Sequence, residues 1–598
     1  MERPDVPPAN IPAELTRRKF LAEGGSALIA ANALRQAVGH RRAWSRPAHP
    51  FVQPTASEMD ALRVLGRTTM RMPGSLPTPA LPAGADTIPE IEHVVVLMLE
   101  NHSHDNLFGM LGRGDGQRPR GDGFTLAKDG RPTATNPYAD GRLQRAFHMP
   151  TTCQLDSTPS QEWTASHNQF DGGRMDGFVR TPISHGSSTV QGPVGMGYWT
   201  GEDLPLTWAL AETFPIADRW FCSCLAQTHP QRRFLIAGTA QGMTGDVGNP
   251  VATPLLGVPA KNGTIFTHMT TAGITWADYN TTGPTGTTME LYNNDHAFTE
   301  TNAPDISQFY ADAKAGRLPQ FSLLDPDFGT QSQENPQNIS VGEGVLGQVI
   351  DALRDSPGWR KTLLILTYDE HGGYYDHVPP PKALAPDDIA PVVNPGEKQY
   401  DGFARYGFRV PSVIIGPFAK RDHVSHVVYD HTSILAFLEH KWNLPAMTRR
   451  DANANNLLDF LDLKALKARR PTFPELPKLV PAGNDAKRLA CSKTGPGTIP
   501  PRAARPTRLD IISTRINAKK HGIVVHVSSG GGRTPAVAVE LRQGQKLLTR
   551  DVLGLLGPHQ RRVVLNTRHR LSPGAYEVVL QSDGRDAVAK KVKIPARS

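Results

Sequence analysis

The sequence predicts an α/β protein, with an α/β/α sandwich around a mostly parallel sheet and a small C-terminal β-sandwich. Continuous apolar runs without alternation are typical of strands buried on both faces of a parallel sheet. Helical patterns separate and follow these runs, and from about residue 501 short alternating strands follow one another between Gly, Ser and Pro turns. The apolar runs and helical patterns occur in this order: 94–99, 305–316, 341–356, 362–370, 410–417 and 429–444.

Individual elements follow from local patterns. Val94 to Leu99, in "IEHVVVLMLE", contains no polar residue and predicts a fully buried strand. In "VGEGVLGQVIDALRDS" the side chains of Val345, Ile350 and Leu353 share one apolar face of a helix. In "THPQRRFLIAG", Pro230 suits the first turn of a helix.

The 598 residues are long enough for several domains, and changes in composition and hydrophobic pattern along the chain indicate their boundaries. We expect a signal region at 1–40, a linker or wrapping arm at 41–89 and the α/β domain at 90–465. A Pro- and Lys-rich linker at 466–505 and an immunoglobulin-like β-sandwich at 506–598 follow.

The N-terminal region predicts export. Arg17 and Arg18 precede Phe20, Leu21 and a short apolar segment, which is typical of a twin-arginine signal for a periplasmic or secreted protein. An ordinary N-terminal helix with two arginines is the alternative. No other segment reaches the roughly 18 apolar residues of a membrane-spanning helix.

The net charge is +8 and the sequence pI is near 9.2, which favours anionic partners. No basic run or nucleic-acid-binding motif is present, so we expect no nucleic acid. The sequence does not indicate an oligomeric state. Basic residues of the β-sandwich either contact an anionic membrane surface or keep the domain soluble: Lys519, Lys520, Arg561, Arg562, Lys590 and Lys591.

Four cysteines are too few for a disulfide scaffold. In an exported protein one bridge is expected, and Cys153 with Cys222 or Cys224 is the first choice, although the sequence alone does not fix the pairing. The fourth cysteine is Cys491. Cys222 and Cys224 have no matching Cys or His pair nearby and do not predict a zinc site.

Ionisable residues gather at the ends of two predicted strands. Glu100 and Asn101 end the first, and Asp369 and Glu370 end the one near 365. Ligands in open α/β sheets bind at the carboxyl ends of strands, and hard oxygen donors suit Ca²⁺, Mg²⁺ or Mn²⁺. Adjacent residues of a strand point to opposite faces of the sheet. Both members of a pair can therefore bind one ion only where the strand ends in a turn, which Gly372 permits after Glu370.

A third element is the helix that Pro230 starts. It puts Thr228 and His229 at its amino end, where free N–H groups attract anions. A threonine hydroxyl beside a metal is a candidate nucleophile for phosphorus. The alternative for Thr228 is a simple helix cap.

These motifs together resemble the bacterial phosphoesterase family of non-haemolytic phospholipases C and acid phosphatases, with the plant non-specific phospholipases C as relatives. The resemblance covers about 91–445, through "VVVLMLENHSHDNLFG", "GRMDGFV", "THPQRRFLIAG", "LPQFSLLDPDF" and "YDEHGGYYDHVPPP". It implies an alkaline-phosphatase-like fold and a divalent metal ion, Ca²⁺ first with Mg²⁺ or Mn²⁺ as alternatives. The implied ligands are Glu100, Asn101, Asp369 and Glu370, with Thr228 as the nucleophile that becomes phosphorylated.

Less specific roles fall to other residues near these motifs. His371 and His377 are candidates to protonate the leaving group or bind the phosphate, and Arg232 to clamp a phosphate oxygen. His229 is a candidate substrate ligand. Asp376 and His377 could instead simply order the loop.

The chain departs from the family pattern at two histidines. Gln161 replaces a histidine before Glu-Trp, and His167 lies six residues on as a substitute. Asn335 stands where the family has the histidine of an Asp-His-Pro segment and is kept as a candidate substrate ligand.

The sequence therefore predicts an exported, metal-dependent phosphoesterase that hydrolyses phosphodiesters such as phosphatidylcholine, as a phospholipase C does. An acid phosphatase with the same nucleophile would act on small phosphate monoesters. A degenerate secreted binding protein is the alternative outside the enzymes.

Overall fold

The computed structural model describes the chain from residue 51 to residue 595 with several gaps. The gaps are 112–120, 128–129, 150–151, 154–158, 183–191, 282–287, 289–290, 293–301, 329, 335–337, 483–508, 518–520, 530–533, 545, 557–559, 568 and 583–584. The predicted signal region lies outside the described residues.

A seven-stranded, mostly parallel sheet forms the centre of the α/β domain. Only the strand of the predicted run at 410–417 breaks the pattern, because it pairs antiparallel with both of its neighbours. In sheet order the strands are β13 (Val424–Ser425), β8 (Ile216–Ala217), β12 (Ser412–Ile415), β11 (Thr362–Tyr368), β3 (His93–Leu99), β10 (Phe321–Asp325) and β9 (Trp276–Asn280).

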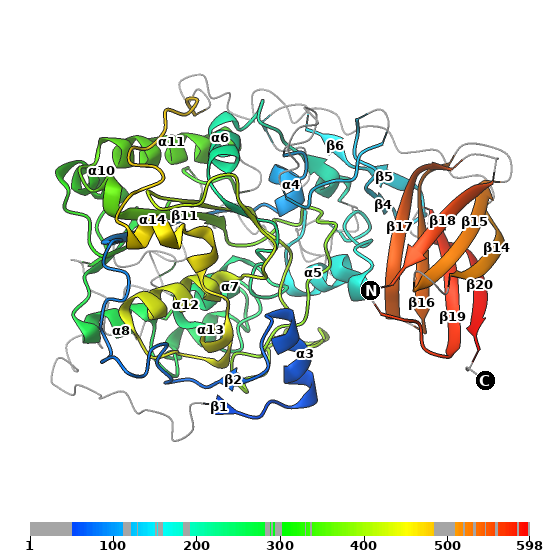
Figure 1. The fold of residues 1–598 in the computed structure, drawn as a ribbon, viewed down its shortest axis with the longest axis horizontal. Helices are drawn as coiled ribbons and strands as arrows, with labels where there is room; N and C mark the ends of the chain where they lie inside the picture. Colours follow the sequence, from blue (N-terminus) through cyan, green and yellow to red (C-terminus); the bar gives the residue numbers. More distant parts are fainter. Residues whose placement is uncertain are drawn as a thin grey trace, which may run out of the picture.

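Helices cover both faces of this sheet, so the predicted α/β sandwich with a mostly parallel sheet is confirmed (Figure 1). One layer contains α6 (Pro205–Thr213), α10 (Ile306–Ala315) and α11 (Ser340–Asp355). The other contains α7 (Thr228–Ala237), α8 (Ile265–Ala272), α12 (His431–Trp442) and α13 (Arg449–Asn453). The remaining helices are α3 (Ala56–Val64), α4 (His104–Phe108), α5 (Trp163–Phe170) and α14 (Leu463–Lys467).

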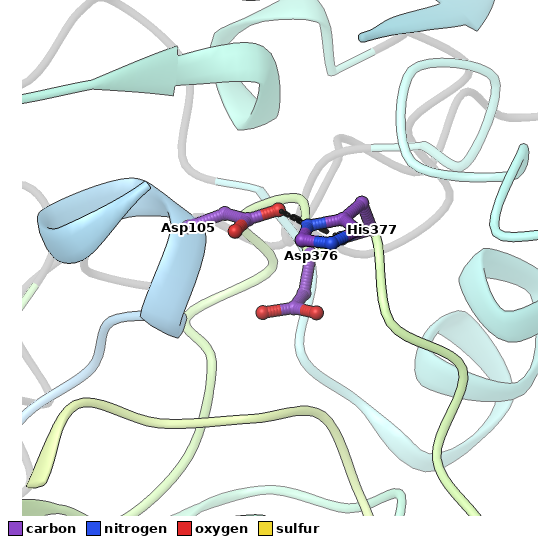
Figure 2. Close-up of side chains that lie close together, drawn as sticks. All are labelled: Asp105, Asp376 and His377. Carbon is purple, nitrogen blue, oxygen red and sulfur yellow. Dashed lines mark hydrogen bonds and ion pairs between the residues drawn. The ribbon is translucent and has the colours of Figure 1, made fainter. Parts of the chain in front are cut away.

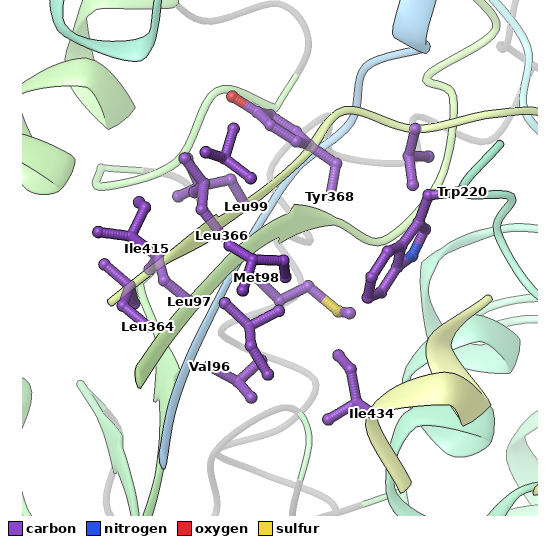
Figure 3. Packing of buried hydrophobic residues seen from close by; sticks show 14 of the residues in the cluster. Val96, Leu97, Met98, Leu99, Trp220, Leu364, Leu366, Tyr368, Ile415 and Ile434 are labelled. Atoms are coloured by element: carbon purple, nitrogen blue, oxygen red, sulfur yellow. The ribbon is translucent and has the colours of Figure 1, made fainter. Parts of the chain in front are cut away.

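The uniform apolar runs form the core because both faces of the sheet are covered. Met98 points to the side of Trp220 and Ile434, whereas Leu97 and Leu366 point to the other side (Figure 3). These side chains are at most 1% exposed. Since both faces are apolar, the polar residues that follow the strands mark where the core ends.

The N-terminal segment 51–89 packs along the α/β domain. It contains α3 and the two-stranded sheet of β1 (Phe51–Val52) and β2 (Met70–Arg71). The main-chain N–H of Arg71 donates to Asn453 in α13, and that of Thr87 donates to the carbonyl of Lys441 in α12. Further two-stranded sheets pair β4 (Thr135–Pro137) with β5 (Leu143–Arg145) and β6 (Phe147–His148) with β7 (Gly197–Tyr198).

The C-terminal region is the predicted β-sandwich, with one sheet of three antiparallel strands and one of four. The first contains β14 (Leu509–Asn517), β15 (Gly522–Ser529) and β18 (Arg561–Asn566). The second contains β17 (Lys546–Leu556), β16 (Thr534–Gln543), β19 (Gly574–Ser582) and β20 (Arg585–Ile594). Its apolar core is separate from that of the α/β domain. No helix within the described residues is long and apolar enough to cross a membrane.

The expected disulfide pairing is wrong. Cys153 is disulfide-bonded, but Cys222 and Cys224 are buried free thiols. Gly407 packs so closely on this segment that an added Cβ would lie 2.2 Å from the sulfur of Cys222. The two thiols therefore serve as small core side chains. Cys491 lies outside the described residues.

We predict that Cys222 and Cys224 do not react with a thiol reagent in the native protein. Burial raises the pKa of Cys224 to about 12 and that of Cys222 well above its usual range, and thiolates are the reactive form. Peptide-resolved mass spectrometry after iodoacetamide treatment should find both thiols modified only in denaturant. Rapid modification of either thiol in the native protein would contradict their placement.

Candidate functional site

The two predicted strand-end pairs meet at one edge of the sheet. β3 and β11 are parallel neighbours with Leu99 opposite Tyr368, and the N–H of Asp369 donates to the carbonyl of Leu99 (3.1 Å). Glu100, Asn101, Asp369 and Glu370 follow directly, and each is fully buried. Buried carboxyl and amide side chains at adjacent strand ends are the arrangement that the sequence predicted.

A turn after Glu370 brings this carboxylate back over the strand ends. Gly372 has φ +65°, and its N–H donates to Oε2 of Glu370 (2.8 Å). A Cβ at Gly372 would lie 2.1 Å from the carbonyl oxygen of Asn101. Only glycine fits both the positive φ and the close approach, so the turn holds Glu370 beside Asn101.

Thr228 lies where α7 begins, with Gln227 as the residue that precedes the helix. The helix ends at Gly238, which adopts the left-handed conformation that glycine favours. Thr228 is fully buried, and its hydroxyl has no hydrogen-bond partner within the described residues. It therefore does not cap its own helix, and its oxygen remains available for chemistry.

Arg232 lies one turn after Thr228 and ties α7 to three strand ends. Its fully buried guanidinium contacts Glu100 (3.1 Å), Asp325 at the end of β10, and Asp369, whose Oδ2 is 3.7 Å from Nε. It also donates to the hydroxyl of Thr288 (3.0 Å). These contacts place the amino end of α7 against the strand ends, so the nucleophile candidate and the ligand candidates belong to one site.

Four side-chain oxygens at these positions are buried without a hydrogen-bond partner in the described part of the chain. Burial of an oxygen that accepts no hydrogen bond destabilises the folded protein, unless a cation or a water molecule binds to that oxygen. All four are hard donors of the kind that divalent cations prefer, so the residues present fit a metal ion. They are Asn101 Oδ1, Thr228 Oγ1, Asp369 Oδ2 and Glu370 Oε1.

The electrostatics of the two carboxyls also fit a cation. Burial raises the pKa of Asp369 to about 7, although Arg232 opposes the shift. Burial and the charge of Asp369 raise the pKa of Glu370 well above its usual range. A bound divalent cation favours the charged form of both groups, because it supplies positive charge where water is excluded.

Three residues that the sequence analysis did not single out contact the candidate residues of this site. His431, at the start of α12, donates from Nε2 to the carbonyl of Asp369 (2.6 Å). Gln169 contacts His371, and Asp246 accepts the N–H of His229 (2.9 Å). His431 could have been found from the sequence, because it begins a predicted helix. The sequence around Gln169 and Asp246 gives no indication that they belong to the site, because only the fold brings those segments close to it.

His371 is buried between two polar partners. Its Nε2 is 2.7 Å from Oε1 of Gln169, and its Nδ1 is 3.0 Å from Oε2 of Glu370. The amide of Gln169 donates to the carbonyl of Ser160, so its oxygen accepts and Nε2 of His371 carries a proton. Burial lowers the pKa of His371 to about 3. His371 therefore lies against the ligand candidates as a neutral ring, with Nε2 hydrogen-bonded to Gln169 and the lone pair of Nδ1 facing Glu370.

His229 follows Thr228 and has a defined tautomer. Its Nδ1 accepts the N–H of Val247 (2.8 Å), so the neutral ring carries its proton on Nε2. The ring is 3% exposed. A buried N–H donor beside Thr228 is suited to an anionic substrate.

His377 belongs to a second cluster (Figure 2). Asp105, Asp376 and His377 each offer one ligand atom within 4.8 Å of the others, a group that could hold a metal ion. However, Arg409 contacts Asp105 and Asp376 at 3.0 Å each, and Nδ1 of His377 is 2.7 Å from Asp105. The carboxylates here already have cationic partners.

The structure describes one of the other two candidates. His167 stacks on Tyr400 with ring centroids 3.9 Å apart and lines a cleft of about 610 Å³ with Arg180. Thr228 and the four ligand candidates are not among the residues that line this cleft. Asn335 lies outside the described residues.

Comparison with known proteins identifies the family. Phospholipase C B of Mycobacterium tuberculosis is 28% identical over 473 residues, which cover 70% of this chain and 89% of that protein. Non-specific phospholipase C1 of Arabidopsis thaliana is 28% identical over 397 residues, which cover 62% and 71%. Non-hemolytic phospholipase C of Burkholderia pseudomallei is 30% identical over 423 residues, which cover 61% and 57%.

A solved structure of a protein in the alkaline phosphatase superfamily from Vibrio parahaemolyticus covers 78% of this chain and 87% of its own. Its sequence identity is 11% and its TM-score is 0.29, so the fold class rests on the strand order itself. The family model, in contrast, matches residues 91–445, more than half of the chain. This match confirms the resemblance, and the chain belongs to the Phosphoesterase family, whose members are hydrolases of phosphoric esters.

Proposed function

We propose that the protein is an exported, metal-dependent phosphoesterase of the phospholipase C type, which cleaves phosphodiesters such as phosphatidylcholine through a phospho-threonine. The observation that carries this proposal is the set of four buried oxygens around the strand ends that have no hydrogen-bond partner within the described residues, one of which is the hydroxyl of Thr228. The names of the relatives favour a phospholipid substrate.

The ion would be held by Glu100, Asn101, Asp369 and Glu370, with Ca²⁺ the first choice because every donor is oxygen. Mg²⁺ and Mn²⁺ are the alternatives. When bound, the metal supplies positive charge that stabilises negative charge on a phosphoryl oxygen. The group of Asp105, Asp376 and His377 is the weaker candidate, because Arg409 already neutralises its carboxylates.

Thr228 is the proposed nucleophile. Its Oγ loses the hydroxyl proton and forms a bond to phosphorus, the bond from phosphorus to the leaving oxygen breaks, and that oxygen takes up a proton and departs as the alcohol. Water then hydrolyses the phospho-threonine and frees the hydroxyl. The N–H groups at the start of α7 favour the negative charge of the phosphoryl group at this position. His229 donates a hydrogen bond from its Nε2–H to a phosphoryl oxygen.

Arg232 acts as a brace in this proposal, in place of the phosphate clamp that the sequence suggested. Its guanidinium is fully buried and engaged with Glu100, Asp325 and Thr288. It positions the ligand carboxylates and the helix of Thr228 relative to one another. His371 lies against Glu370 on the far side, with Nδ1 3.0 Å from Oε2, and its Nε2 proton is used by Gln169.

Export through the twin-arginine pathway completes the proposal. The disulfide at Cys153 supports an oxidising compartment, where such bonds persist. An acid phosphatase with the same Thr228 remains the alternative substrate class, and the first experiment separates the two.

Thr228→Ala should reduce turnover of p-nitrophenylphosphorylcholine at least about 10³-fold, because the nucleophilic oxygen is lost. Thr228→Ser keeps a hydroxyl and should retain measurable turnover, and equal melting temperatures would show that both variants fold. The wild type should lose activity with a chelator and regain it with Ca²⁺. Turnover confined to p-nitrophenyl phosphate would move the protein to the phosphatase class, and full activity of Thr228→Ala would exclude the proposed mechanism.

Arg232→Met should lower the free energy of unfolding by about 3–5 kcal/mol, since it leaves buried carboxylates without their partner. It should also weaken Ca²⁺ binding measured by calorimetry, because Glu100 and Asp369 lose their brace. Arg449→Met is the matched control: its partner Asp388 is 89% exposed, so the cost should stay below about 1 kcal/mol. Arg232→Lys, which keeps the charge but not the planar fork, should fall between the two. Unchanged stability and Ca²⁺ affinity in Arg232→Met would refute the brace.

A further inference from the structure

The positive charge of the chain is concentrated in the C-terminal β-sandwich. Residues 509–598 contain 16 Lys and Arg but only 6 Asp and Glu, a net charge of +10. Of the 65 basic and 57 acidic residues of the chain, 49 and 51 remain in residues 1–508, a net charge of −2. The whole excess of +8 therefore comes from one small domain. Charge segregated in this way points to an anionic partner of that domain.

The two sheets of the sandwich have different surroundings. In the four-stranded sheet, Arg550 of β17 donates to the carbonyl of Arg174 in the α/β domain (3.4 Å). Glu540 and Val579 of this sheet, which lie outside the apolar core of the sandwich, are at most 1% exposed. Figure 1 shows β17 on the side next to the α/β domain, with β18 beside it, and β14, β15 and β20 on the far side. On the outer face of the three-stranded sheet, Arg515 and Arg562 are exposed.

The register of the three-stranded sheet defines what this outer face carries. Arg515, Val524 and Val564 lie side by side across the three strands, and His526 and Arg562 form the next pair. The two arginines are exposed and the two valines are half-buried. Strand residues that alternate with them, such as Val525 and Leu565, fill the core. Ser513 and Asp510 of β14 pair with the outward residues His526 and Ser528 and lie on the same side. We call the five residues Arg515, Val524, His526, Arg562 and Val564 the basic face.

Two exposed aliphatic side chains lie on the edge strand β14. Ile512, at a bulge of this strand, is 46% exposed, and Ile516, which pairs with the core residue Ile523, is 39% exposed at the edge of the sheet. Lys590 of the neighbouring β20 donates to the carbonyl of Ile512 (3.5 Å). Arginines beside exposed branched aliphatics suit a bilayer surface, where the cations meet head groups and the apolar tips enter the interface. A soluble polyanion would leave the isoleucines in water.

We propose that the basic face binds the anionic phospholipid head groups of a bilayer and so holds the α/β domain at a lipid surface. Each basic residue near such a surface contributes about 1 kcal/mol of attraction, which salt weakens. The benefit of this contact for catalysis rests on the proposed phospholipase activity, but the binding itself does not. Because one face of one sheet is proposed to bind, its contribution to vesicle binding can be distinguished from the effect of the net charge of the domain.

The test is cosedimentation of the full chain with vesicles of phosphatidylcholine alone or mixed with phosphatidylglycerol. Two double variants are compared: Arg515→Glu with Arg562→Glu on the basic face, and Lys591→Glu with Lys593→Glu, exposed residues of β20 in the other sheet. Both change the net charge equally. The first should weaken binding to the mixed vesicles at least about tenfold and the second less than about threefold. Both should melt like the wild type.

Three outcomes would overturn the proposal. Equal losses in the two variants would show that net charge alone acts. Equal binding to both kinds of vesicle would exclude anionic head groups, and binding to heparin without binding to vesicles would identify a soluble polyanion as the partner. Turnover of soluble p-nitrophenylphosphorylcholine, which should be unchanged in both variants, separates this proposal from the proposed function.

Discussion

One buried guanidinium, that of Arg232, joins the parts of the site. It contacts Glu100 after β3, Asp325 after β10 and Asp369 after β11, and it belongs to the helix that begins with Thr228. A planar guanidinium can serve several carboxylates at once, because its donors point in fixed directions. Without it, three acidic strand ends would repel one another in a space that excludes water. The arrangement of the proposed nucleophile and the proposed ligands depends on this cation.

The two acidic clusters of the α/β domain show how a structural cluster differs from a candidate metal site. At Asp105 and Asp376, Arg409 and His377 already occupy the carboxylate oxygens. At the strand ends, Arg232 satisfies only part of the negative charge, and one oxygen each of Asp369 and Glu370 has no hydrogen-bond partner within the described residues. The remaining unmatched charge is what a divalent cation would balance. Both clusters use buried arginine, but only the second leaves donors available.

Sequence reasoning succeeded where a pattern is local. Apolar runs predicted β3 and β11, and parallel pairing then placed the residues after them at one edge of the sheet. Pro230 predicted the start of α7. Roles that depend on distant segments were not predictable. Arg232 looked like a phosphate ligand because its carboxylate partners come from three separate strands. The disulfide pairing failed because nothing in the spacing shows that Cys222 is packed under Gly407.

The proposed site of the metal ion is at the strand ends of β3 and β11. An anomalous difference map from crystals of the protein grown with Mn²⁺ would locate the ion. We expect one strong peak among Glu100, Asn101, Asp369 and Glu370. A peak at Asp105, Asp376 and His377, with no density at the strand ends, would contradict the proposed site.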